Sequence, residues 1–237
     1  MRSTSTPKRF RAETKPLQIL LAIKEFITPL SPPVFALEKS MRADPFKILV
    51  SVLLSSRTKD AVTEKAATRL FAAADKPRKI MRLTAAQVGR LIYPVGFFRT
   101  KAKNILKICA ILSQNKKFPA TLDELLELPG IGRKTANLVL ALAFAVPAIA
   151  VDTHVFRISR RLGWATGKTP AVVEKELERL FPRPQWPQVN QVLVGFGQTI
   201  CRPISPKCAE CILQKSCPSS SVGARLSRPR QKAIKII

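Results

Sequence analysis

The chain has 237 residues, 46% of them hydrophobic, which is enough for one or two compact domains with a substantial core. Lys and Arg number 41 against 15 Asp and Glu, and the net charge of +26 favours a polyanionic partner, nucleic acid before an anionic membrane. The longest apolar run, residues 138–151, is shorter than the roughly 18 residues that a membrane-spanning helix needs and is interrupted by Pro147, so no membrane span is expected.

The N-terminal segment, residues 1–16, is polar, basic and rich in Ser and Thr, and it lacks the apolar stretch of a secretory signal. A disordered arm that touches nucleic acid is the simpler interpretation, and a short organellar transit peptide is the alternative. The C-terminal segment, residues 219–237, has the same character: a Ser-rich linker is followed by a basic tail.

The segments between these tails carry helical patterns. Residues 46–56 are apolar nearly all round, which suits a buried helix or a buried strand. Because the rest of the sequence contains neither alternating strands nor Asn-Gly hairpins, we predict a core helix. Residues 103–114 and 171–181 are amphipathic at helical spacing, Cys109 lies on the apolar face of the former, and Thr169 is the predicted N-cap of the latter. The predicted fold class is all-α.

Residues 128–136 (LPGIGRKTA) combine two glycines with two adjacent cations between helical segments. Gly130 and Gly132 allow positive φ and close approach of a backbone, so the stretch is predicted to be a tight hairpin between two helices. Its N–H groups and the start of the next helix would form an anion site. A plain helix connector is the alternative, but Arg133 and Lys134 on so basic a chain favour phosphate binding.

Four of the five cysteines gather near the C-terminus with the spacing C-x6-C-x2-C-x5-C: Cys201, Cys208, Cys211 and Cys217. The absence of a secretory signal argues against disulfides and favours a metal site. Zinc sites of four cysteines usually consist of two separated C-x2-C pairs, whereas a compact loop of four ligands suits a [4Fe–4S] cluster. The spacing favours iron–sulfur over zinc and leaves zinc open.

Three motifs in order, LPGIGRKTANLVL, VDTHVFR and the four-cysteine loop, resemble the endonuclease III family of DNA glycosylase/AP lyases with a helix-hairpin-helix motif. The resemblance spans about residues 17–217. It implies two helical lobes with a DNA groove between them: a six-helix lobe at 38–147, and a lobe formed by 17–37 and 148–218 that ends in the cluster loop. It also selects a [4Fe–4S] cluster as the cofactor held by the four cysteines.

The resemblance places the catalytic lysine at Lys134 and the catalytic aspartate at Asp152. Independently, the positive end of a helix and the neighbouring Arg133 would disfavour the ammonium form of a lysine at 134, leaving an amine for Schiff-base formation at a sugar C1′. Asp152 precedes the helical segment 153–162, so capping alone is one interpretation. A carboxylate near C1′ could also stabilise oxocarbenium character as the base leaves, and both roles can hold together.

Other expected DNA contacts follow from weaker matches. The family stretch around Arg57 places a polar residue in the gap left by a flipped base, but bacterial members carry Gln there, which leaves the opposite-base preference open. Phe97 would be an apolar wedge, with core packing as the alternative. His154 would line the pocket or be a satisfied structural histidine. Arg202 and Lys207 would contact phosphates or be solvated charges.

The sequence therefore predicts a bifunctional DNA glycosylase/AP lyase that removes oxidised pyrimidines from duplex DNA and cuts the strand by β-elimination. The alternatives are a mismatch glycosylase that removes uracil or thymine opposite guanine, and a non-catalytic iron–sulfur DNA-binding protein. The expected partner is double-stranded DNA with damaged bases or abasic sites, bound by a monomer. The expected location is the cytoplasm, near the nucleoid, in a prokaryote, and the nucleus or an organelle in a eukaryote.

Overall fold

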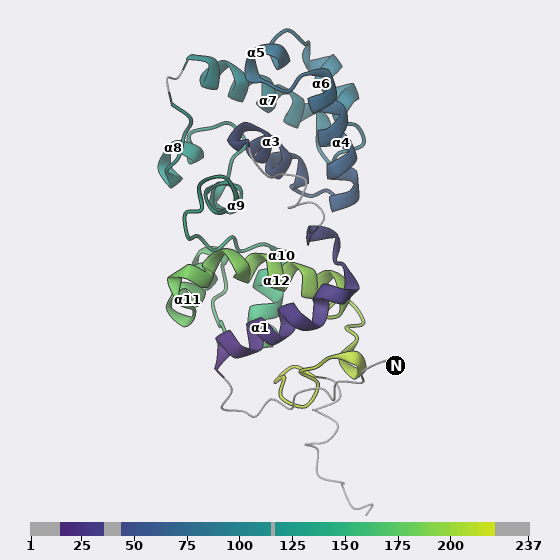
Figure 1. Ribbon diagram of the computed structural model, residues 1–237, viewed down its shortest axis with the longest axis vertical. Helices are drawn as coiled ribbons and strands as arrows, with labels where there is room; N and C mark the ends of the chain where they lie inside the picture. The colour runs from purple at the N-terminus through teal and green to yellow at the C-terminus, as the bar shows by residue number, and fades with distance from the viewer. Residues whose placement is uncertain (1–14, 36–43, 115–116, 221–237) are drawn as a thin grey trace, which may run out of the picture.

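The computed structural model describes residues 15–35, 44–114 and 117–220, and within these ranges it contains helices and no β-strand (Figure 1). The predicted all-α fold is confirmed. The basic arm predicted at 1–16 and the tail predicted at 219–237 lie, except for two residues each, outside the described residues. None of the described helices combines the length and apolarity that a membrane span requires.

The helices in chain order are α1 (Pro16–Ile27), η1 (Thr28–Leu30), α3 (Pro45–Ser55), α4 (Asp60–Ala73), α5 (Pro77–Ile80), α6 (Ala85–Ile92), α7 (Phe98–Gln114), α8 (Leu122–Leu126), α9 (Arg133–Phe144), α10 (Thr153–Arg161), α11 (Pro170–Leu180), η2 (Arg183–Gln185), α12 (Trp186–Thr199) and η3 (Cys208–Glu210).

The buried apolar side chains form two separate cores. The first core is built by α3 to α9, and the second core by α1, α10, α11 and α12 together with the loop that carries the four cysteines. Figure 1 shows the two groups of helices as the upper and lower halves of an elongated molecule, with the cysteine loop at the lower end. The boundaries of the two lobes predicted from the sequence, 38–147 and 17–37 with 148–218, stay a prediction.

Each core surrounds one central helix. In the first core α3 is buried along nearly its whole length, which explains why residues 46–56 are apolar all round. The helix starts where Asp44 accepts hydrogen bonds from the Phe46 and Lys47 amides, with Pro45 at the first helical position. In the second core α12 has the central place and packs against α1 and α10.

Two further helix starts matter for the site. At α10 the side chain of Asp152 caps the helix, and at α11 Thr169 accepts a hydrogen bond from the Val172 amide at 3.4 Å, so both predicted caps are confirmed. By contrast, α7 begins at Phe98 and not at 103. Its first turns look polar in the sequence because they include Lys101, which is nevertheless buried.

Candidate active site

The structure brings Lys134 and Asp152 together. Lys134 is the second residue of α9, and its Nζ lies 3.9 Å from Oδ2 of Asp152. The other carboxylate oxygen, Oδ1, accepts hydrogen bonds from the amides of His154 at 2.9 Å and Val155 at 2.8 Å, which cap α10. The carboxylate thus has one oxygen for the helix and one for the lysine, so the geometry accommodates both roles considered for Asp152.

The short segment that leads into Asp152 is held by two buried asparagines. Asn137, on α9, donates a hydrogen bond from Nδ2 to the carbonyl of Ile149 at 3.0 Å. Asn190, on α12, donates from Nδ2 to the carbonyl of Ala150 at 2.7 Å. Because these amides satisfy two carbonyls of a buried, non-helical segment, they fix its position relative to both helices. Neither asparagine is among the site residues predicted from the sequence; a polar amide inside an otherwise apolar helix face is the signal that marks them.

An open cavity of about 770 Å³ lies over the pair and is lined by Lys134, Asp152, His154 and Arg57 among others. A recess of about 70 Å³ shares Lys134 and Asp152 with it and is otherwise bounded largely by apolar side chains. The amine and the carboxylate therefore face a space with the size of a small-molecule site. Across the cavity, Gln198 of α12 donates to Asp60 of α4 at 2.6 Å.

His154 lines this cavity and is also held within the structure. Its Nδ1 lies 3.2 Å from Nη2 of Arg157, which also donates to the carbonyl of Cys201 at 2.9 Å. Burial lowers the pKa of His154, so the ring is neutral at physiological pH and Nδ1 accepts from the guanidinium. A Cβ at Gly197 would overlap Nδ1 of His154, so α12 can pass this close only without a side chain there.

Arg57 and Phe97, from separate loops, stack on each other. The Arg57 guanidinium lies 5.3 Å from the centre of the Phe97 ring, within the range of a cation–π contact. Both residues have positive φ, 53° and 57°, a conformation that bulky side chains adopt only when the surroundings impose it. Phe97 is 62% exposed, so the core-packing alternative considered for it is wrong.

Lys101 lies beneath the Arg57 loop and fixes its backbone. Its Nζ donates to the carbonyls of Leu54 at 2.9 Å and Ser56 at 2.5 Å, and it lies 3.4 Å from Oγ1 of Thr58. The residue is 6% exposed, and burial lowers its pKa to about 8. Lys101 lies in a polar stretch of the sequence that gives no signal for this role, because its three acceptors lie more than 40 positions earlier.

The glycine hairpin between α8 and α9 has the conformation predicted for it. Gly130 has a φ of +81°, and a side chain there would overlap the amide group of Asn104. Gly132 is the N-cap of α9, and a Cβ added there would meet no atom within 4 Å. The N-terminus of α9 is therefore open on the side of Gly132, as an anion site requires.

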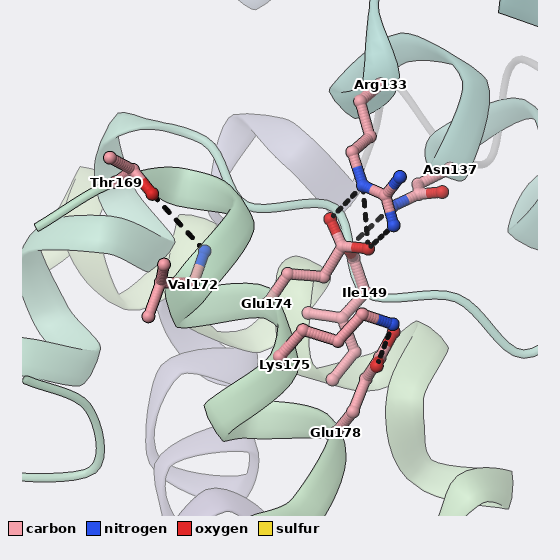
Figure 2. A network of polar contacts seen from close by, with 8 residues as sticks. All are labelled: Arg133, Asn137, Ile149, Thr169, Val172, Glu174, Lys175 and Glu178. Atoms are coloured by element: carbon pink, nitrogen blue, oxygen red, sulfur yellow. Dashed lines mark hydrogen bonds and ion pairs between the residues drawn. The ribbon is translucent and has the colours of Figure 1, made fainter. Parts of the chain in front are cut away.

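Arg133 forms an ion pair with Glu174 of α11. Its Nε lies 3.1 Å from both carboxylate oxygens of Glu174, and its Nη2 lies 2.7 Å from Oε1 (Figure 2). The hydrogen bonds that Arg133 donates to Glu174 raise the pKa of Arg133. The cation that the sequence analysis placed beside Lys134 for phosphate binding is thus paired with a carboxylate of α11.

The four predicted ligand cysteines are free thiols that line a common cavity of about 100 Å³. Burial raises the pKa of Cys211 to about 12, and burial also raises the pKa of Cys217. Four thiolates could therefore stay together here only with a strongly cationic group between them. Within the part of the chain that the structure describes, no three candidate ligands are close enough to hold a single ion. The four sulfurs around one cavity are consistent with a site for such a cationic group.

The loop before this cavity is held by α10. Arg161 donates from Nη1 to the carbonyl of Arg202 at 2.7 Å and to Sγ of Cys201 at 3.4 Å. Arg202 itself is exposed, and Lys207 forms an exposed ion pair of 3.0 Å with Glu210. Such a surface pair is weak, so the Lys207 ammonium is available to another anion.

Comparisons with known proteins agree on one family. A family model described as "HhH-GPD superfamily base excision DNA repair protein" matches residues 50–183. The chain is 45% identical over 176 residues to endonuclease III of Thermotoga maritima, an alignment that covers 73% of this chain and 83% of the relative. It is 46% identical over 180 residues to endonuclease III-like protein 1 of Mus musculus, of which it spans only 60%.

Two solved structures extend the likeness to three dimensions. The first is titled as a trapped endonuclease III–DNA covalent intermediate, with a TM-score of 0.78, 35% identity and coverage of 90% of this chain and 98% of the other. The second is titled as a non-covalent endonuclease III–DNA complex, with a TM-score of 0.76, 34% identity and the same coverage.

The burial of Lys101 predicts a pH dependence of stability. With a pKa of about 8 in the folded chain and an ordinary value of 10.5, the unfolded chain binds the extra proton between these pH values. The free energy of unfolding of the wild type, relative to Lys101→Met, should therefore rise from pH 8 to pH 10.5, by at most about 3 kcal/mol. Denaturant titrations across this range measure the difference. Lys103→Met, at an exposed position of the same helix, controls for loss of a lysine; a flat difference for Lys101→Met would contradict the assignment.

Proposed function

The chain belongs to the endonuclease III family of the HhH-GPD superfamily of base excision DNA repair proteins, and on this basis we propose that it is a bifunctional DNA glycosylase and AP lyase that removes oxidised pyrimidines. The observation that carries the proposal is the Lys134 amine beside the Asp152 carboxylate in an open cavity between the two cores.

The pair can perform the chemistry in order. Asp152 Oδ2 accepts a proton from the Lys134 ammonium, and the free amine attacks C1′ of the damaged nucleotide as the bond to the base breaks. The proton passes on to the departing base, so the carboxylate is negative again and stabilises the positive charge that develops on the sugar. The resulting imine to the opened sugar acidifies the C2′ protons, so loss of one of them expels the 3′ phosphate and cuts the strand.

Duplex DNA is held, in this proposal, by backbone and by inserted side chains. The open N-terminus of α9, with Gly130 and Gly132, binds a phosphate next to the lesion. The stacked pair of Arg57 and Phe97 enters the duplex where the damaged nucleotide has left it, as an exposed aromatic ring beside a planar cation is suited to do. Because Arg57 offers only donors, it favours an acceptor-rich opposite base such as guanine.

Further contacts are electrostatic. The net charge of +26 supports binding to a polyanion, and Arg202 and Lys207 present exposed cations on the cysteine loop for phosphates. His154, being neutral and in the cavity lining, contacts the flipped nucleotide without adding charge. We expect one monomer per lesion, acting wherever cellular DNA lies: the nucleoid of a prokaryote, or the nucleus or an organelle of a eukaryote.

Cys201, Cys208, Cys211 and Cys217 would hold a [4Fe–4S] cluster. Its irons would neutralise the four thiolates and tie the cysteine loop to the second core, and neither hydrolysis nor elimination at the sugar requires an electron. The position of the loop at the end of α10 supports a structural role, because Arg161 already joins that helix to Cys201.

Replacing the lysine tests the nucleophile. Lys134→Gln keeps length and polarity but has no amine, so it should bind lesion-bearing duplex, form no adduct when borohydride is added during turnover, and leave the strand intact. Lys59→Gln, which removes a lysine from the rim of the same cavity, is the control and should still be trapped. Trapping of Lys134→Gln at the wild-type rate would place the nucleophile elsewhere.

Replacing the aspartate separates capping from chemistry. Asp152→Asn keeps an oxygen that can cap α10 but loses the charge beside Lys134, so the melting temperature should change little while base loss slows by about 100-fold or more. Asp44→Asn makes the same change at the cap of α3 and should alter neither quantity much. Base loss at the wild-type rate by Asp152→Asn, measured in single turnover, would remove the carboxylate from the mechanism.

Metal analysis tests the cluster. The protein as purified should be yellow-brown and contain about four irons per chain and no stoichiometric zinc. Cys208→Ala should lower the iron content and loosen the loop, whereas Cys109→Ala, at the fifth cysteine in the first core, should leave the iron content unchanged. One zinc and no iron after anaerobic preparation would refute the assignment.

A further inference from the structure

We propose that Arg133 is a positioning residue: its ion pair with Glu174 locks the start of α9 onto α11 and thereby sets the position of Lys134 relative to Asp152. The inference rests on the proposed function, because it concerns the alignment of that catalytic pair. It also replaces the phosphate contact that the sequence suggested for Arg133.

The pair has the geometry of a fixed connection. Three donor–acceptor distances of 2.7 to 3.1 Å join the guanidinium to both oxygens of one carboxylate, a fork that leaves little freedom of rotation (Figure 2). The side chain of Glu174 is only 6% exposed, whereas that of Arg133 is 42% exposed. A carboxylate this buried depends on its cationic partner, so a phosphate that drew Arg133 away would leave Glu174 charged and unpaired.

The two residues stand on different cores. Arg133 is the first residue of α9, which packs into the first core through Ala136, Val139 and Leu140. Glu174 is on α11, which packs into the second core through Val173 and Leu177. The ion pair therefore bridges the same division that the catalytic pair crosses, since Lys134 is on α9 and Asp152 caps α10 in the second core.

Arg133 is the first of three residues of α9 that contact the second core or the segment leading to Asp152. One turn farther along the helix, Asn137 binds the Ile149 carbonyl at 3.0 Å, three residues before Asp152. Lys134 lies between these two anchors, and its own link to Asp152 is a gap of 3.9 Å. Without Arg133, the first turn of α9 would lose its outer link to the second core, and the amine could move away from the carboxylate.

A displacement of about 1 Å at reacting groups can cost on the order of 100-fold in rate. Loss of either partner should therefore lower the rate of the chemical step without lowering affinity for undamaged duplex. A phosphate contact behaves in the opposite way, because its removal weakens binding to damaged and undamaged DNA alike and reduces the salt dependence of binding.

The experiment compares Arg133→Gln, Glu174→Gln and the double variant. Single-turnover base loss and borohydride trapping are measured at saturating enzyme, and affinity is measured on undamaged duplex at two salt concentrations. We expect each single variant to lose roughly 10- to 100-fold in both rates, and the double variant to lose no more than the worse single variant, because both changes break one link. Affinity and salt dependence should stay within about twofold for Glu174→Gln, which removes no cation.

Two further variants serve as controls, one for the loss of a nearby ion pair and one for the loss of charge at Arg133. Glu178→Gln breaks the neighbouring Lys175–Glu178 pair of 2.8 Å within α11 (Figure 2) and should change neither rate nor affinity. Arg133→Lys keeps the charge but not the fork, and since Arg133 is 42% exposed it should fold even if Glu174→Gln does not. Its rate should fall between those of the wild type and Arg133→Gln.

The outcomes separate cleanly. If the wild type forms no adduct, the proposed function is wrong. If the wild type is trapped and Glu174→Gln and Arg133→Lys react at its rate, the positioning role is wrong while the function stands. If Arg133→Gln alone loses affinity for every duplex and the salt dependence falls with it, Arg133 is a phosphate contact after all.

Discussion

The division of the molecule into two cores imposes one geometric constraint on everything else: the segment from Ile149 to Asp152 must occupy a fixed place between them. Buried amides from either side hold it, with Asn137 reaching from the first core and Asn190 from the second. Such a segment would otherwise carry unsatisfied carbonyls in an apolar surrounding. Because side chains from both cores satisfy these carbonyls, the segment is held rigidly, and it carries the carboxylate that the proposed mechanism uses.

The stacked pair of Arg57 and Phe97, which we propose enters the duplex, is rigid for a different reason. Arg57 and Phe97 each keep a backbone conformation that is unfavourable for their side chains, and the ring remains exposed to water. The contacts that impose this geometry, the buried Lys101 ammonium above all, are already formed in the protein alone. The strained backbone and the exposed ring are therefore present in the protein alone, so the proposed insertion into a duplex would not require the loops to become ordered on binding.

How far the sequence predicts the molecule depends on how far each interaction reaches along the chain. The caps at Asp152 and Thr169 and the hairpin at Gly130 depend on groups within a few residues, so local patterns were sufficient for them. The partner of Arg133 lies 41 positions away. The adjacency of Arg133 to Lys134 in the sequence predicts that both bind phosphate, and the ion pair with Glu174 does not support phosphate binding by Arg133.

Whether a side chain is buried is equally hard to predict from sequence when its contacts lie far away along the chain. Lys101 has acceptors 45 and 47 positions earlier in the chain, and nothing in its neighbours distinguishes it from the many solvated lysines of so basic a protein. For Phe97 the sequence left wedge and core open, because an aromatic residue after a glycine suits either. Its exposure follows from how two loops meet, which is a property of the tertiary fold.

The two oxygens of the Asp152 carboxylate make different contacts, and this has a consequence for how members of the family can evolve. One oxygen caps α10, and the other faces Lys134 and serves the reaction in the proposed mechanism. A change from acid to amide at this position leaves the helix start intact, so selection for a stable protein does not eliminate it. Lineages in which the chemistry was no longer needed could therefore drift to well-folded, DNA-binding descendants that have lost catalysis by exchanging a single side-chain oxygen for nitrogen.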